Sequence, residues 1–348
     1  MKVASDELSK PYTASARPAA ASATPAASGA ASPAASRPNR EVFGFVQAGA
    51  LGPSSGRGWN TYDYSLLTTV AYFGLHVNSG DGNLVQVANG KTETGWGVWN
   101  SNDVGDMYNA AKAAGARVVL TIVSQENASN MCQSLLHGSN TIGWAVQQMR
   151  ARNFDGINLD YESGNGPCNG SDNRTLLRSM VANLRAQMDS DGVHHHLTVD
   201  TYAGSAVGSG DFYDVGGMAP FVDAFFVMAY PLDDSNWGSP PLSCSRYCFS
   251  PTSPASAYRY NDDLVAQQYS AVAGAAKTIL GLPYFGYAAC VDLWNPNAYP
   301  SAAPHWTVPT MWTLDGIATA PGISNYAEHL DVHDGVSRFA TYHGSGND

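Results

Sequence analysis

The sequence predicts an α/β protein whose core is a parallel β-sheet covered by helices. Short apolar or β-branched runs alternate with amphipathic stretches along residues 41–290. The runs are apolar almost throughout, which is typical of strands buried on both faces. Acidic and aromatic side chains stand at the ends of several runs, where parallel α/β folds carry their functional groups. These three observations define the fold class.

Seven runs have the length and composition of strands. An eight-stranded α/β barrel needs one more, and a chain of 348 residues is long enough to form such a barrel. After Tyr287, Arg338–Tyr342 is too short and too near the end to serve as the eighth strand. We therefore expect an α/β barrel that lacks its eighth strand at the C-terminus. The predicted strands are Val42–Gln47, Leu67–Val77, Val118–Ser124, Gly156–Glu162, His196–Tyr202, Val222–Tyr230 and Thr278–Phe285.

Four stretches between the strands have helical character. The stretch 103–114 has an Ala-rich face and stops at Gly115, and glycine commonly ends helices. The apolar residues within 176–188 have the spacing of an amphipathic helix. Helices between parallel strands cover the faces of the sheet. The predicted helices are Asp103–Ala114, Ile142–Arg150, Leu176–Met188 and Asp263–Ala273.

The first forty residues differ from the rest of the chain. Residues 11–39 consist almost entirely of Ala, Pro and Ser. Such a segment cannot offset its ordering entropy by burial, so residues 1–40 are predicted to be a disordered linker. Residues 41–348 are then one barrel domain, incomplete at its C-terminus.

The formal net charge of −11 bears on the partners. Nucleic acids and anionic membranes are bound through clustered Lys and Arg, so this balance argues against both. No stretch has the roughly 18 apolar residues of a membrane span. Met1–Lys10 is polar and no apolar leader follows it, yet the low charge density and the Ala/Pro/Ser linker are typical of a secreted bacterial protein. We expect a secreted or cell-wall-associated monomer.

Five cysteines fit an extracellular location. Cys132 and Cys168 follow the third and fourth predicted strands, which are neighbours on one rim, and we expect them to form a disulfide. Two of the remaining three (Cys244, Cys248 and Cys290) would form another. The alternative is a set of ordinary buried thiols. The spacings do not indicate a zinc site.

The nonapeptide 154–162, Phe-Asp-Gly-Ile-Asn-Leu-Asp-Tyr-Glu, carries the main functional signal. Side chains two apart on a strand share a face, so Asn158, Asp160 and Glu162 line one face and apolar residues the other. A buried unpaired carboxylate is costly and tends to take up a proton, and a carboxyl protonated at neutral pH can serve as a general acid. The strand is therefore predicted to be catalytic, with a buried ion-pair network as the alternative.

His194-His195-His196 suggests a metal site at first sight. Alternation along a strand directs the middle histidine away from its two neighbours. No carboxylate pattern accompanies the three residues. We therefore expect no metal site and no organic cofactor.

Three segments resemble family 18 glycoside hydrolases, the chitinase-like (β/α)8 TIM barrels. Residues 155–162 are similar to the family signature Asp-Gly-x-Asp-x-Asp-x-Glu. Residues 225–230, Phe-Phe-Val-Met-Ala-Tyr, are similar to its sixth strand, which ends in Met-x-Tyr. Residues 278–286 are similar to its seventh strand, commonly Leu-Gly-Leu-Pro-x-Tyr-Gly. Order and spacing agree as well, so the resemblance extends over residues 42–290.

The resemblance implies a glycosidase that cleaves β-1,4 bonds next to N-acetylglucosamine, in chitin or peptidoglycan, by a retaining, substrate-assisted mechanism. Glu162 would protonate the glycosidic oxygen and later activate water. The 2-acetamido carbonyl of the substrate would attack the anomeric carbon. Asp160 would stabilise the acetamido N–H, and Tyr230 would hydrogen-bond the acetamido oxygen. Asn158 and Asp155 would support these groups.

Further side chains are assigned to substrate binding. Met228 belongs to the sixth-strand motif, and aromatic rings offer flat apolar surfaces to sugars. For each ring, packing in the core is the alternative. The residues assigned to substrate binding are Tyr202, Met228, Tyr284 and Trp237.

The sequence departs from the family pattern in four places. Asn158 replaces an Asp and cannot share a proton with Asp160. Pro231 follows Tyr230 where many chitinases have Asp. The third strand ends Ser124-Gln-Glu rather than Ser-x-Gly-Gly, and the eighth strand with its sugar-stacking Trp is missing. Two alternatives to an enzyme therefore stay open: a non-hydrolytic carbohydrate-binding protein and an inactive fragment of a larger hydrolase.

Overall fold

The computed structural model describes residues 40–52, 58–230, 232 and 261–282, and four further strands within 286–343. The chain divides into two compact units. The first holds the described residues up to Met228 and those from Gln268 to Leu280. The second holds the other described residues. Each unit is described by itself.

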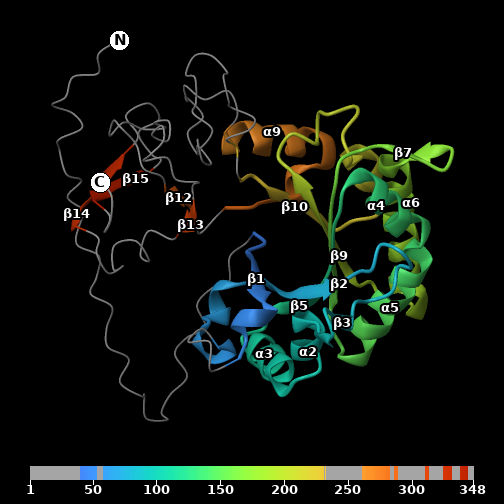
Figure 1. Ribbon diagram of the computed structural model, residues 1–348, viewed down its shortest axis with the longest axis horizontal. Helices are drawn as coiled ribbons and strands as arrows, with labels where there is room; N and C mark the ends of the chain where they lie inside the picture. Colours follow the sequence, from blue (N-terminus) through green and yellow to red (C-terminus); the bar gives the residue numbers. More distant parts are fainter. Residues whose placement is uncertain are drawn as a thin grey trace. The chain divides into compact units, whose positions relative to one another are not determined.

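A seven-stranded sheet forms the centre of the first unit, and all of its pairings are parallel. Parallel neighbours need long crossover connections, and the segments between them supply these. The strands follow one another across the sheet in chain order (Figure 1). They are β1 (Phe43–Gln47), β2 (Thr69–His76), β5 (Arg117–Gln125), β6 (Gly156–Glu162), β9 (His196–Tyr202), β10 (Ala224–Met228) and β11 (Thr278–Leu280).

Helices lie on the outside of this sheet, and α6 packs against both α4 and α5 (Figure 1). The Asn127 side chain accepts from the N–H groups of Ser129 and Asn130 and so caps α4. Asp172 caps α6 in the same way, through the N–H of Thr175. The helices are α2 (Thr94–Trp99), α3 (Asn102–Ala113), α4 (Ala128–Leu136), α5 (Gly138–Ala151), α6 (Asn173–Met188), α7 (Val215–Met218) and α9 (Asp262–Ala273), with 3-10 turns at Ala48–Ala50, Trp59–Thr61, Tyr64–Leu66, Asp189–Asp191 and Ala275–Lys277.

The predicted strands and helices are largely confirmed. The strands expected at 156–162 and 196–202 form at those residues. The seventh is shorter than expected: β11 ends at Leu280, and residues 283–285 of the predicted run lie outside the described chain. Three helices, α2, α4 and the short α7, were not predicted. Glycine, Asn and Ser lower their helix propensity, and burial of side chains such as Trp99 stabilises them instead.

The sheet curls into a barrel. Phe226 on β10 contacts Phe43 and Phe45 on β1, with ring centroids 5.5 and 4.9 Å apart. Four strands separate β1 from β10 in the order of the sheet, so only a curved sheet brings these rings together. The interior is therefore a packed core. The fold is a (β/α)8 TIM barrel without an eighth strand among the residues that the structure describes.

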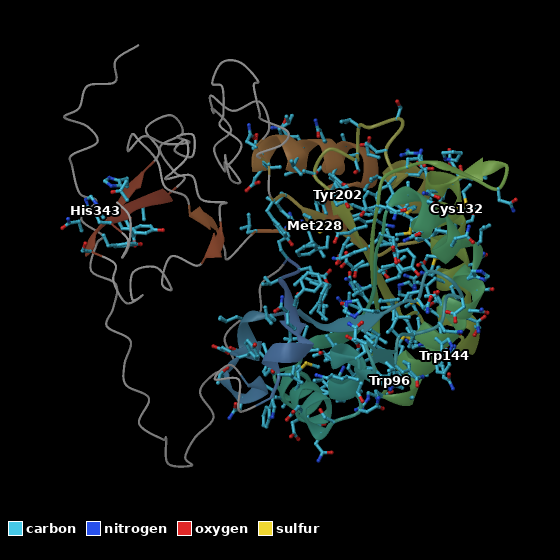
Figure 2. The ribbon with its side chains drawn as sticks, viewed as in Figure 1. Trp96, Cys132, Trp144, Tyr202, Met228 and His343 are labelled. Carbon is cyan, nitrogen blue, oxygen red and sulfur yellow. A yellow bond between two sulfur atoms is a disulfide. The ribbon has the colours of Figure 1, made fainter. Side chains whose placement is uncertain are left out.

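A disulfide joins two connections on the rim of the barrel. Cys132 on α4 and Cys168 are bonded across a sequence separation of 36 residues. Figure 2 shows Cys132 beside α4 and α6. The predicted pairing is confirmed, and Cys244, Cys248 and Cys290 lie outside the described residues. Two short hairpins complete this unit: β3 (Val87–Ala88) with β4 (Lys91–Thr92), and β7 (Pro167–Cys168) with β8 (Ser171–Asp172).

The described part of the second unit contains two antiparallel pairs of strands. The segment Arg338–Tyr342, considered above for the eighth barrel strand, lies in β15 and pairs with β14 instead. Within the described ranges, no helix is long and apolar enough to cross a membrane. The pairs are β12 (Gly286–Ala288) with β13 (Thr310–Trp312), and β14 (Ser324–Leu330) with β15 (Arg338–His343).

Ion pairs hold the amino-terminal ends of the barrel strands. Glu41, just before β1, lies 3.0 Å from Arg117 of β5 and 3.1 Å from His196 of β9. Asp223, just before β10, lies 2.6 Å from Arg185 of α6. Burial raises the pKa of both acids, but hydrogen bonds and nearby cations outweigh it and leave each pKa below its ordinary value. This end of the barrel therefore carries compensated charges.

Candidate active site

The carboxyl-terminal half of β6 directs three polar side chains into the barrel. Asn158 is fully buried, Asp160 is 2% exposed, and Glu162 is half-buried at the end of the strand. Ile157 and Leu159 alternate with them and are buried on the opposite face. The predicted alternation is therefore confirmed, and it puts two carboxyl groups at successive positions on the interior face.

The neighbouring strands hold Glu162 from both sides. On β5, Gln125 pairs in register with Glu162, and its Nε2 donates to Glu162 Oε1 at 2.6 Å. On β9, the Tyr202 hydroxyl lies close to the Glu162 carboxyl group. Burial, and then the charge of Glu162, raises the pKa of Tyr202, so its hydroxyl keeps its proton. Two neutral polar groups thus fix the position of the Glu162 carboxyl group.

Asp160 lies in a site that disfavours its charge. Burial, and then the charge of Glu162, raises the pKa of Asp160 to about 8. Asp160 Oδ1 is buried and has no hydrogen-bond partner among the described residues. A carboxyl with this pKa is protonated at neutral pH. A ligand group that donates a hydrogen bond to it, such as an amide N–H, would favour its charged form.

Asp200 on β9 adds a third buried carboxyl group. Its side chain is 2% exposed, and its Oδ2 accepts from Asn158 Nδ2 at 2.9 Å. Thr198 Oγ1 donates to Asn158 Oδ1 at 2.6 Å, which orients the amide. Burial, and then the charge of Asp160, raises the pKa of Asp200 well above its ordinary value, against the hydrogen bond from Asn158. The centre is therefore acidic and strongly desolvated.

Aromatic side chains fix the ends of β6 and β9. The Tyr202 and Tyr213 rings pack edge to face, with centroids 5.1 Å apart. The Tyr213 hydroxyl donates to the Tyr161 carbonyl at 2.8 Å, and the Tyr269 hydroxyl donates to the Tyr202 carbonyl at 2.6 Å. Met228 of β10 is the register partner of Tyr202, and Figure 2 shows the two beside each other. The carboxyl ends of these strands are therefore well anchored.

The structure brings most of the predicted site residues together. Glu162, Asp160 and Asn158 share one face, and Tyr202 with Met228 lies on the next two strands. This arrangement agrees with the predicted roles, which stay predictions.

Four other predicted residues lie elsewhere or outside the described chain. The Asp155 carboxylate pairs with Lys112 at 2.8 Å and accepts from the backbone N–H of Val118 at 2.7 Å, so it anchors the beginning of β6. Tyr230 is half-buried, follows β10 by two residues and belongs to the second unit. Tyr284 and Trp237 lie outside the described residues.

Two polar groups of the centre were missed in the sequence. The signal for Asp200 was present, because alternation along 196–202 puts it on the same face as Tyr202. Gln125 stood in the segment that departs from the family pattern at the end of the third strand. What the sequence lacked was the register that aligns Gln125 with Glu162 and Thr198 with Asn158.

The three consecutive histidines lie at the other end of the strands, each near an acid. His194 lies 2.8 Å from Asp223, and His195 lies 3.0 Å from Asp191. His196 is the partner of Glu41 described above. In the part of the chain that the structure describes, no group of three or more His, Cys, Asp or Glu is placed to hold a metal ion.

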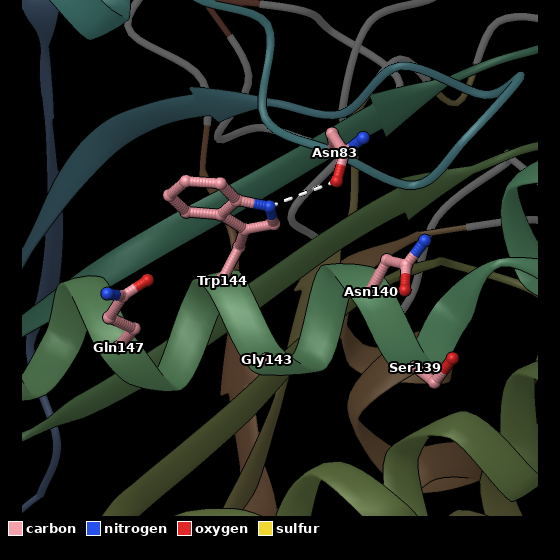
Figure 3. A pocket seen from close by; sticks show the side chains of 6 residues that line it. All are labelled: Asn83, Ser139, Asn140, Gly143, Trp144 and Gln147. Carbon is pink, nitrogen blue, oxygen red and sulfur yellow. Dashed lines mark hydrogen bonds between the residues drawn. The ribbon is translucent and has the colours of Figure 1, made fainter.

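An open pocket lies on the outer face of α5 (Figure 3). The Trp144 Nε1 donates to Asn83 Oδ1 at 3.0 Å, so the indole is held by a neighbouring loop. The lining contains no carboxyl group and so offers no acid for hydrolysis. The lining residues are Asn83, Ser139, Asn140, Gly143, Trp144 and Gln147.

The fold and the acidic centre define a class of protein: TIM barrels that carry carboxyl groups at the carboxyl ends of their strands. Comparison with known families agrees. The chain belongs to the glycosyl hydrolases family 18, whose sequence profile matches residues 55–321. No curated protein sequence matches the chain significantly.

Solved structures of chitinases are similar in fold. A class V chitinase from Nicotiana tobaccum is 17% identical, with a TM-score of 0.62 over 86% of this chain and 83% of that one. A group IV chitinase from Ostrinia furnacalis is 16% identical, with a TM-score of 0.60 over 87% and 84%. A family 18 chitinase from Cycas revoluta in complex with (GlcNAc)3 is 16% identical, with a TM-score of 0.62 over 86% and 84%. At these identities the likeness establishes the fold.

Proposed function

We propose that the protein is a glycosidase that cleaves β-1,4 linkages next to N-acetylglucosamine, in chitin or peptidoglycan, by a retaining, substrate-assisted mechanism. Membership of family 18 supports glycoside hydrolysis, although the family also includes inactive members. The relative in complex with (GlcNAc)3 supports a ligand built from N-acetylglucosamine. The observation that carries the proposal is the pair of interior carboxyl groups, Asp160 and Glu162, on one face of β6.

In this mechanism Glu162 is the proton donor, held by Gln125 and Tyr202. Its proton passes to the glycosidic oxygen as the bond to the anomeric carbon breaks. The acetamido oxygen of the substrate forms the new bond to that carbon, which gives an oxazolinium ion. Glu162, now a carboxylate, takes a proton from water as the water attacks the anomeric carbon. The bond from that carbon to the acetamido oxygen breaks in the same step, which restores the neutral acetamide and the protonated Glu162.

Asp160 serves the substrate amide. The acetamido N–H donates to the Asp160 carboxyl group, which favours its charged form and offsets the burial that raises its pKa. The Asp160 proton is released to solvent as the substrate binds, and the resulting carboxylate then stabilises the positive oxazolinium ring at short range in a site of low polarity. Tyr230 hydrogen-bonds the acetamido oxygen, while Asn158 and Asp155 act as supporting residues.

The remaining assignments complete the proposal. Tyr202, Met228, Tyr284 and Trp237 bind the sugar chain. The protein acts outside the cell or at the cell wall, as a monomer without a nucleic-acid or membrane partner. Residues 1–40 form a linker to the catalytic barrel of residues 41–348.

The test is the mass profile of products from N-acetylglucosamine oligomers and from peptidoglycan, with an otherwise identical 2-hydroxy oligomer as the matched control. Cleavage is expected only where the acetamide is present, because the acetamide is the nucleophile. Glu162→Gln should lower kcat by roughly 10²- to 10⁴-fold, with little change in the affinity for the sugar. Equal cleavage of the 2-hydroxy oligomer would refute neighbouring-group participation.

The second candidate function is carbohydrate binding without turnover. The specific observation in its favour is the barrel of seven strands among the described residues, which lacks the strand that carries the family's sugar-stacking Trp. Calorimetric binding of N-acetylglucosamine oligomers by the unmodified protein, together with no detectable products after long incubation, would favour this function over hydrolysis.

A further inference from the structure

Asp200 has no role in the mechanism above, yet it lies beside Asp160. The β6–β9 register pairs Leu159 with Val199, so the next pair along the strands is Asp160 and Asp200. Neighbouring strands are about 5 Å apart, and both side chains are on the interior face. Two carboxyl groups are therefore cross-strand neighbours in a region almost without solvent.

The hydrogen bonds of the pair leave one oxygen on each acid unsatisfied. Asp200 Oδ2 accepts from Asn158, whereas Asp200 Oδ1 and Asp160 Oδ1 are buried and have no partner in the described chain. Buried polar atoms in native proteins almost always have partners. When the bound substrate amide favours the charged form of Asp160, one proton on Asp200 Oδ1, donated to Asp160, would satisfy both atoms in a charge-assisted hydrogen bond.

The surroundings favour such a shared proton. The titratable groups that face Asp200 are Asp160 and Glu162 from β6 and Tyr213 from the segment after β9. Burial raises the pKa of Tyr213 well above its ordinary value, so this group stays neutral. On β10 the register partner of Asp200 is Phe226. Adjacent buried acids do not both ionise in such a setting, and they titrate as a pair.

We propose that Asp200 is a positioning residue that keeps the proton of this pair, so that Asp160 alone carries the negative charge that faces the substrate. The pair then has a net charge of −1: one proton stays on Asp200, and Asp160 receives the substrate amide. This inference rests on the proposed function. It also accounts for Asn158, which stands where the family signature has Asp. The Asn158 amide donates to Asp200, and Asp200 on the neighbouring strand supplies the carboxyl group that position 158 lacks.

Two substitutions at position 200 separate the possible roles. Asp200→Asn replaces a protonated acid with a neutral donor of the same shape, so kcat should stay within roughly fivefold of the unmodified value. Asp200→Leu removes the donor, and kcat should fall roughly 10- to 100-fold, the effect of losing one hydrogen bond to a charged group. KM should change little in both variants, since Asp200 does not touch the substrate.

Two further measurements would not change if Asp200 had a merely structural role. First, Asp200→Asn should make the alkaline limb of the kcat–pH profile shallower, because the second ionisation of the pair is gone. Second, the double variant Asn158→Asp with Asp200→Asn moves the acid back to position 158 and should restore the original slope of that limb. Asp223→Asn is the matched control, which should lower stability but leave the profile unchanged. Equal losses in Asp200→Asn and Asp200→Leu, or an unmoved profile in Asp200→Asn, would overturn the proposal.

A measurement without substrate keeps this inference separate from the proposed function. A carboxyl whose pKa is raised in the folded state stabilises it fully below the unfolded pKa of about 4, and this stabilisation is lost as pH rises towards the folded pKa. Urea unfolding of the unmodified protein should therefore show stability falling from pH 4 to 8, and Asp200→Asn should reduce that slope. A slope unchanged by the substitution contradicts a proton on Asp200, whether or not the protein hydrolyses any glycan.

Discussion

The two ends of the barrel treat acidic side chains in opposite ways. At the amino-terminal end, Glu41 and Asp223 have cationic partners within 3.1 Å, and the pKa of each is lowered. At the carboxyl-terminal end, β6 and β9 carry Asp160 and Asp200, which have no such partners among the described residues, and the pKa of each is raised. Burial is a cause at both ends, so the difference lies in the neighbours.

The contrast indicates that the amino-terminal end of the sheet contributes stability and the carboxyl-terminal end contributes chemistry. Paired charges at one end lock the beginnings of the strands and gain nothing from a ligand. Unpaired acids at the other end are costly in the free protein, and a ligand that supplies donors or positive charge would relieve the cost. TIM barrels in general divide their ends in this way. Substitutions at the two ends should therefore differ in kind.

The largest effect is expected from Asp160→Asn. Turnover of N-acetylglucosamine oligomers should fall roughly 10²- to 10⁴-fold, because a neutral amide cannot stabilise the oxazolinium charge. The free energy of unfolding at pH 8 should not fall, since the substitution removes a buried charge. Steady-state kinetics and urea unfolding test the two halves. If Asp160→Asn lost stability but kept its turnover, the carboxyl-terminal end would serve stability rather than catalysis, contrary to the assignment above.

The next largest effect is expected from Arg185→Met at the other end. This change removes the guanidinium that lies 2.6 Å from the Asp223 carboxylate, which keeps His194 at 2.8 Å, and should lower the free energy of unfolding by about 1.5–3 kcal/mol. The kcat of the folded fraction should stay within twofold of the unmodified value. Chemical unfolding and active-site titration measure the two quantities. A loss of turnover without a loss of stability would place chemistry at the amino-terminal end as well.

A moderate effect is expected on the pH dependence of stability, with opposite signs at the two ends. The lowered pKa of Glu41 and of Asp223 contributes stability above their unfolded pKa of about 4, which is lost as pH falls through the folded value. The pKa of Asp160, raised to about 8, contributes stability at low pH that is lost between about pH 4 and 8. Both Asp223→Asn and Asp160→Asn should therefore unfold like the unmodified protein near pH 3 and deviate from it as pH rises to 9, with Asp223→Asn less stable and Asp160→Asn more stable than the unmodified protein.

The smallest effect is expected from Tyr202→Phe. It removes the hydroxyl that lies close to Glu162 and keeps the ring that packs on Tyr213, so kcat should fall roughly fivefold to tenfold. Gln125→Leu should have a comparable effect, because it removes the hydrogen bond that Gln125 donates to Glu162. Kinetics of the two single variants and the double variant measure the coupling. An unchanged kcat in both would remove these residues from the positioning of Glu162.

Some features of the protein follow from the chain alone. The period of two along 156–162 is enough to put Asn158, Asp160 and Glu162 on one face, because alternation is a property of any extended backbone. The strand–helix order likewise implies a parallel sheet, since parallel neighbours need long crossovers. The Cys132–Cys168 disulfide could be predicted for the same reason. The connections that follow neighbouring parallel strands lie on the same rim of the barrel, so their cysteines are close enough to pair.

The tertiary structure decided which groups meet across strands. Register aligns Gln125 with Glu162 and brings Asp200 beside Asp160, and no local pattern encodes the offset between two strands far apart in the chain. It also decided that, among the described residues, the acids at one end have cationic partners and Asp160 and Asp200 at the other end do not. The pKa of a carboxyl group depends on burial and on neighbours in space, so residues identical in the sequence acquire opposite chemistry when the sheet closes.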